Sequence, residues 1–422
     1  MAGLNETPGA NRIHIAFFGL RNAGKSTLVN AFTGQQIAIV SDVAGTTTDP
    51  VSKAMEILPL GPCLVTDTAG LDDVGELGEM RVRKTLDVLA TTDIAVWVWG
   101  ERDEDRGKRD EFLATCQKRG VAVVEYRRGD SVDELKKRIA AVKLTDEAPG
   151  LLDGLVKRGD RVLCVCPIDE SAPKGRLILP QVQVIRACLD IGATATVCQP
   201  GDVEGVLGAW CLVPGALRSI LVITDSQAFG EVAEAIDRVG RREDASATGM
   251  RLTSFSILFA RQKGDIAAYV EGLKGLKSLK DGDHVLIAEG CTHHRQCNDI
   301  GTVKIPKAIA KLTGKRLDFT FASGTAFPIP KSPITKHQAP STQHPAPSTQ
   351  HQAPSTQHQA PSTQHPAPST NPSLIVQCGG CMLTRREVLR RIGLAREAGV
   401  PIVNYGMVLA LAAGVDLERC VF

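Results

Sequence analysis

The sequence GLRNAGKS at residues 19–26 decides the fold of the first part of the chain. It fits the P-loop pattern, in which a glycine-rich turn ends in Lys-Ser or Lys-Thr. The apolar run at 13–18 predicts a buried strand before it, and residues 25–32 have helical composition. Strand, glycine loop and helix are the order that a phosphate site requires, because backbone N–H groups and the helix N-terminus bind the phosphates. The sequence therefore predicts a nucleotide site here.

Two further motifs follow in the order expected of a nucleotide switch, GTTTD at 45–49 and DTAG at 67–70. A threonine of the first motif is expected to close over Mg²⁺ and the γ-phosphate, and the second motif to sense the γ-phosphate. The candidate catalytic residues are Lys25, Thr47, Asp67 and Gly70. The candidate nucleotide-binding residues are Gly19, Asn22, Ala23, Gly24, Lys25, Ser26, Thr27 and Thr46, with Ser26 and Thr47 as Mg²⁺ ligands.

These three motifs resemble those of the translation-factor-related GTPases, close to the Era and MnmE groups. The resemblance implies GTP and Mg²⁺ as cofactors. It also implies K⁺, because Asn22 stands where potassium-activated members place an asparagine that helps to bind the ion. Leu71 stands where Ras-like enzymes have a catalytic glutamine, so slow hydrolysis is expected.

The guanine-reading motif Asn-Lys-x-Asp is missing. The candidate strand at 121–124 runs into EYRRGD at 125–130, and Asp130 is the candidate guanine-binding residue if this is a degraded copy of the motif. Alternatively, residues 129–135 resemble the last loop and helix of the GTPase domain, and one strand–helix unit has been lost. Spacing favours the second interpretation, and guanine specificity stays open.

Length, charge and composition restrict the number of domains, the possible partners and the expected location of the protein. A length of 422 residues predicts about two to four domains. A net charge of +2 gives no overall field for nucleic acid or a membrane surface, and no apolar segment approaches the roughly 20 residues that span a bilayer. With no signal-peptide pattern at the start, a cytoplasmic location is expected, where 12 cysteines do not form a disulfide framework. Seven of them lie in or beside apolar runs and are expected in cores, namely Cys63, Cys116, Cys164, Cys166, Cys188, Cys198 and Cys211.

A second α/β pattern begins after a linker at 146–150. Strands are expected at 161–166, 194–198 and 220–224, with a helix at 179–191. This alternation predicts a parallel sheet, and we interpret the region as an interaction or dimerisation module. Asp225 and Ser226 follow a strand and are expected to cap a helix.

Soft metal ligands gather in two short turns of the last third, CTHHRQC at 291–297 and CGGC at 378–381. Expected strands at 284–288 and 374–376 lead into them, and a helix is expected at 385–398. Thiolates and imidazoles in such turns indicate zinc or an iron–sulfur cluster, and the residues alone leave both open.

With these turns the whole chain resembles the [FeFe]-hydrogenase maturation GTPases, the HydF family. The motifs that carry the resemblance, in chain order, are GLRNAGKST, SDVAGTTTDP, DTAGLDD, LVITDSQAF, LTSFSILFARQKGD, CTHHRQCNDIG, CGGCM and VPIVNYG. It implies a GTPase domain, a dimerisation domain and a [4Fe–4S] domain. It also implies a homodimeric scaffold that carries the di-iron precursor of the hydrogenase cluster, with the radical SAM maturases HydE and HydG and the apo-hydrogenase HydA as partners.

By position, the resemblance makes Cys291, Cys378 and Cys381 the three thiolate ligands, with one iron site open or weakly held. The family has a histidine before the second cysteine pair, but here that residue is Gln377, which cannot supply an imidazole. His293 keeps the other histidine position. Cys297 is an additional thiol and either a fourth ligand or a bystander.

Five heptads of the type HQAPSTQ separate the two cysteine turns, at 337–371. A proline in every repeat excludes a coiled coil and predicts a disordered insertion. The expected fold class is α/β throughout. The expected domains are a P-loop GTPase domain at 8–145, a central dimerisation domain with a parallel sheet at 150–272, and an iron–sulfur domain at 275–422 that contains the insertion at 335–372.

Two alternative functions stay open. One is a stand-alone potassium-dependent GTPase in ribosome or tRNA work, with structural zinc in the C-terminal domain, although 4% aromatic residues and a near-neutral charge give an RNA surface little support. The other is a degenerate scaffold that has lost GTP specificity, as the missing guanine motif and Gln377 suggest.

Overall fold

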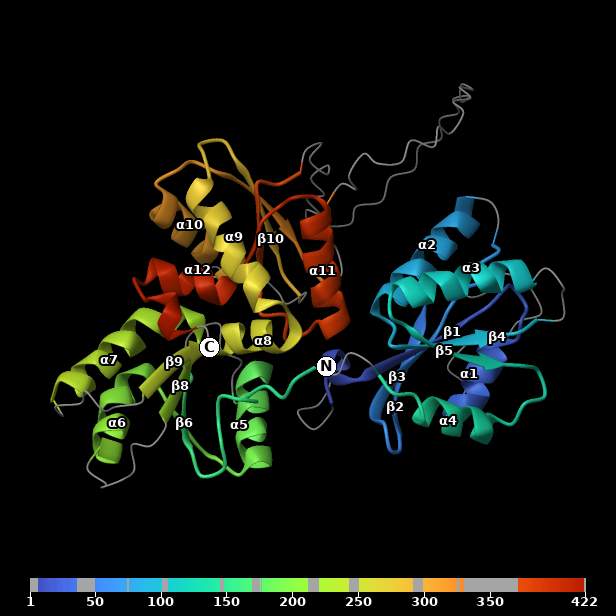
Figure 1. Ribbon diagram of the computed structural model, residues 1–422, viewed down its shortest axis with the longest axis horizontal. Helices are drawn as coiled ribbons and strands as arrows, with labels where there is room; N and C mark the ends of the chain where they lie inside the picture. The colour runs from blue at the N-terminus through green and yellow to red at the C-terminus, as the bar shows by residue number, and fades with distance from the viewer. Residues whose placement is uncertain are drawn as a thin grey trace, which may run out of the picture.

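The computed structural model describes residues 7–35, 50–73, 76–100, 105–144, 148–168, 175, 177–211, 220–242, 250–290, 299–324, 327–329 and 371–420. They form three α/β units, each with helices packed on one sheet (Figure 1). The α/β fold class expected from the sequence is confirmed. The repeat insertion at 335–372 lies almost wholly outside the described residues. Among the described helices, none combines the length and apolarity needed to cross a membrane.

The first unit is a five-stranded sheet in the order β2-β3-β1-β4-β5, in which only β2 runs antiparallel to its neighbour. Phe17 and Ile15 point into the core under one face, and Phe18 and Ala16 into the core under the other. This alternation is the period of two expected of a strand buried on both sides. The elements are a 3₁₀ turn (Gly9–Asn11), β1 (Ile13–Phe18), α1 (Lys25–Thr33), β2 (Val51–Ile57), β3 (Gly61–Asp67), α2 (Glu76–Thr91), β4 (Ile94–Val98), α3 (Asp105–Lys118), β5 (Ala122–Tyr126) and α4 (Val132–Ala140).

The described residues between Trp99 and Lys143 contain one strand, β5, followed by α4. Ser131 caps α4, because its side chain accepts a hydrogen bond from the backbone N–H of Glu134. The segment after Tyr126 is thus a tight turn into a helix, and Asp130 lies in that turn.

The central unit is a four-stranded sheet in the order β7-β6-β8-β9, with every pair parallel, as the sequence predicted. The prediction that Asp225 caps a helix is wrong. It stands at the N-cap position of a 3₁₀ turn without capping it, and its Oδ2 accepts a hydrogen bond from Gln181 Nε2 at 2.9 Å. The elements are β6 (Arg161–Val165), α5 (Leu179–Ile191), β7 (Thr194–Cys198), a 3₁₀ turn (Pro200–Asp202), α6 (Val203–Cys211), β8 (Ile220–Thr224), a 3₁₀ turn (Ser226–Ala228), α7 (Phe229–Arg242), β9 (Met250–Ser254) and α8 (Phe255–Lys263).

The last unit is a second four-stranded parallel sheet, in the order β11-β10-β12-β13. One continuous apolar core includes residues of both this sheet and the central sheet, so these two units pack as one body. The elements are α9 (Ile266–Ser278), β10 (His284–Ala288), a π-helical turn (Ile300–Lys304), α10 (Ile305–Thr313), β11 (Asp318–Ala322), β12 (Leu374–Gln377), α11 (Arg385–Glu397), β13 (Ile402–Asn404), α12 (Tyr405–Ala412) and a 3₁₀ turn (Leu417–Arg419).

The cysteines outside the two metal-ligand turns follow the expectation of core residues in five cases. Cys63, Cys116, Cys164, Cys166 and Cys188 are buried free thiols. Cys198 and Cys211 are only partly buried, although both pack against the shared core.

The first unit has apolar cores of its own, and α11 of the last unit faces it in Figure 1 and contacts it. The Arg386 guanidinium donates to Asp93 Oδ1 at 3.3 Å, to Arg119 O at 2.8 Å and to Gly120 O at 3.1 Å. One side chain thus joins α11 to the start of β4 and the turn before β5. We call this contact the Arg386 clasp.

Replacing Arg386 by alanine is expected to loosen this contact. Hydrogen bonds to a charged donor contribute about 1.5–3 kcal/mol each, so protection of residues 117–124 in hydrogen–deuterium exchange should fall by roughly tenfold or more. Arg396→Ala is the control, because Arg396 lies at the other end of α11 and its side chain is 71% exposed. Equal exchange in the two variants would show that the clasp does not hold the units together.

Candidate functional site

The loop after β1 has the close approach that a phosphate site needs. A Cβ atom at Gly19 would lie 2.5 Å from the carbonyl oxygen of Val98 in β4, so only glycine fits there. Gly24, with φ of +89°, is the N-cap residue of α1, and Asn22 is the only non-glycine residue with a positive φ, at +62°, in the described structure. These left-handed positions turn the backbone around the N-terminus of α1, where N–H groups are free for an anion.

Lys25 is buried at the base of this loop. Its Nζ donates to the carbonyl oxygens of Leu20 at 2.8 Å and Gly19 at 3.3 Å. Burial lowers the pKa of Lys25, and the nearby Asp67 carboxylate acts in the opposite direction. The ammonium group is therefore held beside the loop by weak neutral acceptors, which a phosphate can replace.

Asp67, the last residue of β3, faces the start of α1. Its Oδ2 accepts a hydrogen bond from Ser26 Oγ at 2.6 Å, and its buried Oδ1 has no hydrogen-bond partner among the described residues. Burial raises the pKa of Asp67, while the Ser26 hydrogen bond and Lys25 lower it. A serine hydroxyl and a carboxylate in contact, with one carboxylate oxygen unused, form the donor set that P-loop proteins offer to Mg²⁺.

The segment after Asp67 packs directly on the P-loop. Thr68 Oγ1 donates to Phe17 O at 2.6 Å, and the Leu71 N–H donates to Gly19 O at 3.3 Å. A Cβ at Gly70 would lie 2.8 Å from the backbone nitrogen of Arg21, so glycine is required where the two loops touch. The predicted sensor loop and the predicted phosphate loop are thus in contact.

The remaining predicted nucleotide residues divide into two groups. Ala23 and Thr27 lie in the P-loop and the first turn of α1, whereas Thr46 and Thr47 lie outside the described residues. Asp130 Oδ2 accepts from the Arg127 N–H at 3.0 Å and lies 3.7 Å from Arg138 Nη2. Its carboxylate therefore has a local role in the turn after β5.

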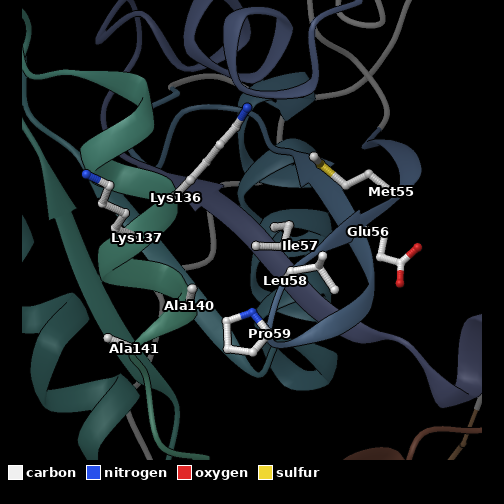
Figure 2. Close-up of a pocket in the computed structure, with 9 residues that line it drawn as sticks. All are labelled: Met55, Glu56, Ile57, Leu58, Pro59, Lys136, Lys137, Ala140 and Ala141. Atoms are coloured by element: carbon white, nitrogen blue, oxygen red, sulfur yellow. The ribbon is translucent and has the colours of Figure 1, made fainter.

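A pocket of about 550 Å³ in this unit lies away from the P-loop (Figure 2). The hairpin between β2 and β3 forms one wall and α4 the other. Gly19 follows the carboxyl end of β1, whereas this hairpin turn lies at the opposite end of the strands. Its lining is mainly apolar, with two lysines and one glutamate: Met55, Glu56, Ile57, Leu58, Pro59, Lys136, Lys137, Ala140 and Ala141. It contains none of the predicted nucleotide ligands.

The CGGC turn follows β12 at the carboxyl edge of the C-terminal sheet. β10 and β12 are adjacent and parallel, with Ala288 opposite Gln377, so residues 289–290 and 378–381 leave the sheet side by side. The chain goes from β10 to β11 on one side and then to β12 on the other, so the carboxyl ends of β10 and β12 form a topological switch point, where ligands bind in parallel sheets. At this point the Gly290 N–H donates to Cys378 Sγ at 3.0 Å.

The CGGC turn is wedged between α8 and α11. A Cβ at Gly379 would lie 3.0 Å from Cα of Ser256 in α8, and Gly380 has φ of +72°. Partial burial raises the pKa of Cys378, while the N–H groups of Gly380 and Gly290 lower it by hydrogen bonding to the sulfur. Gln377 is fully buried, and its Nε2 donates to Tyr269 OH at 3.2 Å. Its side chain is therefore occupied with α9.

The residues present fit an iron–sulfur cluster. Backbone N–H groups directed at a cysteine sulfur stabilise a thiolate, and a thiolate is the ligand that such clusters require. Cys291, His293 and Cys297 lie outside the described residues, but Gly290, which binds Cys378 Sγ, directly precedes Cys291. Within the described ranges, no three His, Cys, Asp or Glu side chains are grouped to hold a metal ion. A site of three cysteines thus depends on the segment that begins at Cys291.

Sequence reasoning missed the buried charges around this turn. Lys263 Nζ donates to three carbonyl oxygens of the turn, and burial lowers its pKa to about 8 against the opposing effect of the Cys381 and Cys378 thiolates. Arg391 is fully buried in α11, with Nε 2.9 Å from Glu387 Oε1. The spacing of four residues between Glu387 and Arg391 is a sequence signal for an ion pair on one helix face. A lysine at the end of an apolar helix is common, so the role of Lys263 has no signal in the sequence.

Comparison with known protein families accounts for most of the chain. Residues 151–264 match the hydrogen maturase F dimerization domain, and residues 267–338 and 334–421 match the hydrogen maturase F tetramerization domain. Residues 14–127 match the 50S ribosome-binding GTPase family. The two maturase domains occupy consecutive segments and together cover more than half of the chain.

Individual relatives match the GTPase part. The tRNA modification GTPase MnmE of Endomicrobium trichonymphae is 38% identical over 106 residues, which are 24% of this chain and 23% of the relative. MnmE of Paramagnetospirillum magneticum is 33% identical over 172 residues, 36% of this chain and 39% of the relative. The chain thus spans less than two fifths of the length of these relatives.

A solved structure of Era from Aquifex aeolicus, bound to GDP and AlF4⁻, aligns with 74% of this chain and 92% of its own at 14% identity. Its TM-score of 0.24 is too low to carry an argument. The assignment therefore depends on the domain matches. With a GTPase domain followed by both maturase domains, the chain belongs to the hydrogen maturase F (HydF) family.

Proposed function

We propose that this protein is a GTP-binding and GTP-hydrolysing scaffold of [FeFe]-hydrogenase maturation that carries the di-iron precursor as its cargo. The observation that supports this most is the Gly290 to Cys378 hydrogen bond, because it brings the residue directly before Cys291 to Cys378 in a chain with both maturase domains. The proposed partners are HydE, HydG and apo-HydA, and the working unit is a homodimer.

At the nucleotide end, each proposed role follows from the position of a side chain. Lys25 would exchange the Leu20 and Gly19 carbonyl oxygens for β- and γ-phosphate oxygens. Ser26 and Asp67 would hold Mg²⁺, directly and through water, with Thr46 or Thr47 closing from the first switch. The Gly70 N–H would sense the γ-phosphate next to the P-loop, and Asn22 would bind K⁺. Since Leu71 cannot orient water as a glutamine does, hydrolysis is expected to be slow.

At the other end, Cys291, Cys378 and Cys381 would bind a [4Fe–4S] cluster, with His293 or Cys297 beside it. A cluster with three protein thiolates offers one iron site for docking and electron transfer. The chain's own groups do the rest: Gly290 and Gly380 stabilise the Cys378 thiolate, and Gln377 stays with Tyr269. The arrangement supports a carrier, since the residues that would hold the cluster follow β10 and β12 at the switch point of their sheet.

A second candidate is the same scaffold without guanine preference, with any nucleoside triphosphate as the switch ligand. The observation in its favour is that Asp130 binds Arg127 and Arg138 in its own turn. Affinities for GTP, ATP and XTP, measured on the wild type and on Asp130→Asn, distinguish the two. If Asp130 reads guanine, the wild type prefers GTP and the variant shifts towards XTP. Equal affinities for all three nucleotides would establish the second candidate.

Asp67→Asn should stabilise the nucleotide-free protein while weakening its binding of Mg²⁺–GTP. Because burial raises the pKa of Asp67, the folded state binds more protons than the unfolded state between the ordinary and the raised pKa. Stability from this group therefore falls as pH rises through that interval, and the charge costs stability at neutral pH. We expect the Tm of the variant to exceed that of the wild type by roughly 2 °C at pH 7, with a smaller difference at lower pH.

Asp110→Asn is the matched control, because the Asp110 side chain is 68% exposed and lies in α3. Thermal unfolding without nucleotide and titration calorimetry with Mg²⁺–GTP are the measurements. A lower Tm in Asp67→Asn, or unchanged Mg²⁺-dependent affinity, would contradict the assigned role.

Removing any of the three proposed cluster ligands should abolish the cluster. Iron and sulfide content and the EPR spectrum of the reduced protein are measured after anaerobic reconstitution of wild type, Cys291→Ala, Cys378→Ala and Cys381→Ala. We expect about four irons in the wild type and loss of the signal in each variant. Cys211→Ala, a partly buried cysteine of the central unit, should behave as wild type. Zinc in place of iron in the wild type would favour a structural metal site instead.

A further inference from the structure

Lys263, the last residue of α8, has an unusual environment for a lysine. It is only 3% exposed, and its Nζ donates to Leu383 O at 2.7 Å, Cys381 O at 3.2 Å and Gly380 O at 3.3 Å. An ammonium group has three N–H donors, so all of them are used. The three acceptors belong to one short segment, which curls around the lysine.

The turn needs a donor at this place. The carbonyl oxygens of Gly380, Cys381 and Leu383 point to one spot, and a buried carbonyl oxygen that loses a donor costs free energy. The Gly380 oxygen also accepts from the Leu383 N–H at 2.9 Å, so Lys263 is its second donor. Only a group with several donors, at the end of a long side chain, satisfies them together. Lys263 therefore fixes the path of the backbone that presents Cys381, and with it the separation of Cys378 and Cys381.

The lysine comes from a different unit than the turn. Residues 151–264 match the dimerization domain, whereas the turn lies in the segment that matches the tetramerization domain. Two further contacts join α8 to this segment: Ser256 lies against Gly379 of the turn, and Arg385 Nη1, at the start of α11, donates to Gln262 O at 2.8 Å. The cysteine turn thus packs on α8 of the central unit.

The charge of Lys263 also affects which oxidation state of a bound cluster is favoured. Inside a protein, charges interact more strongly than in water, and the proposed ligands are thiolates. The groups of either sign that act on this turn are Arg391 and Glu289 beside Cys378 and the Lys263 ammonium beside both cysteines. A cation behind the turn favours the more negative, reduced state of a cluster held there.

We propose that Lys263 of the central unit is a positioning residue of the iron–sulfur site: it holds the Cys378–Cys381 turn and stabilises the reduced cluster. The electrostatic part of this inference rests on the proposed cluster, whereas the positioning part does not. The central unit then takes part in the cluster site as well as in oligomer formation.

The test compares Lys263→Met, Lys263→Gln and Lys263→Arg with the wild type. Lys274→Met is the control, because Lys274 lies in the next helix with its side chain 77% exposed. In the metal-free protein, alkylation of Cys378 and Cys381 by iodoacetamide, followed by mass spectrometry, reports how firmly the turn is held. Lys263→Met should react on the order of tenfold faster than wild type and Lys274→Met, since the ammonium group that links Gly380, Cys381 and Leu383 is lost.

In the reconstituted protein, release of iron to a chelator and the midpoint potential by EPR titration are the second readout. Loss of a group that supports metal ligands typically costs 10–100-fold in affinity, so iron should leave Lys263→Met roughly tenfold faster. The potential should become more negative in Lys263→Met and Lys263→Gln and return towards wild type in Lys263→Arg, which keeps the charge. Lys263→Gln keeps two donors and provides a neutral variant if methionine prevents folding.

Alkylation and iron release equal to wild type in both neutral variants would overturn the positioning role. An unchanged potential in those variants would overturn the electrostatic role. If the wild type assembles no cluster, the proposed function fails, and the alkylation rates of the metal-free protein still decide the positioning role.

Discussion

The parallel pairing of β10 with β12 is the constraint on which the C-terminal site depends. Between these strands the chain makes α10, β11 and the whole heptad insertion, yet Ala288 and Gln377 stand opposite each other in register. Backbone hydrogen bonds fix that register, so the sheet sets the separation of Gly290, which directly precedes Cys291, from Cys378. An insertion of this length adds only a modest entropic cost to closing the loop, on the order of 1 kcal/mol, which the strand pairing easily offsets.

The same rule of parallel sheets positions the nucleotide site. In the order β2-β3-β1-β4-β5 the chain goes from β1 to one side and later to the other, and the P-loop leaves β1 at that switch point. The central sheet has a switch point too, between β6 and β8, but its carboxyl edge is used for packing. There Gln181 binds Asp225, Ser226 Oγ lies 3.2 Å from Ser254 Oγ, and Lys304 of the C-terminal unit donates to Gln227. Two of the three switch points thus carry candidate chemistry, and the third joins the units.

Sequence patterns predicted the parts of this structure that are local. The P-loop is contiguous, and each apolar run that was predicted to be a strand contains one, as expected for the strands of parallel sheets that are buried on both faces. Contacts between segments that are distant in the sequence could not be predicted from these patterns. In the sequence Lys263 is an ordinary lysine at a helix end, and only the structure shows that carbonyl groups of residues 380–383 surround it. The sequence likewise indicates a helix cap for Asp225, whereas in the structure its carboxylate accepts a hydrogen bond from Gln181. The partner of each side chain is chosen by tertiary packing, which periodicity does not encode.

The arrangement of the units also restricts how nucleotide state could reach the cluster turn. α2 begins soon after the Asp67–Gly70 segment and contacts α11, which follows the CGGC turn directly. The Arg386 clasp binds the same helix to Asp93, whose other oxygen accepts from the His14 N–H at the start of β1. Both connections end on α11, which begins four residues after Cys381, and the turn itself is held by Lys263 of α8. The two candidate sites are thus linked by a continuous series of contacts, and contiguity of this kind is what coupling between them would require.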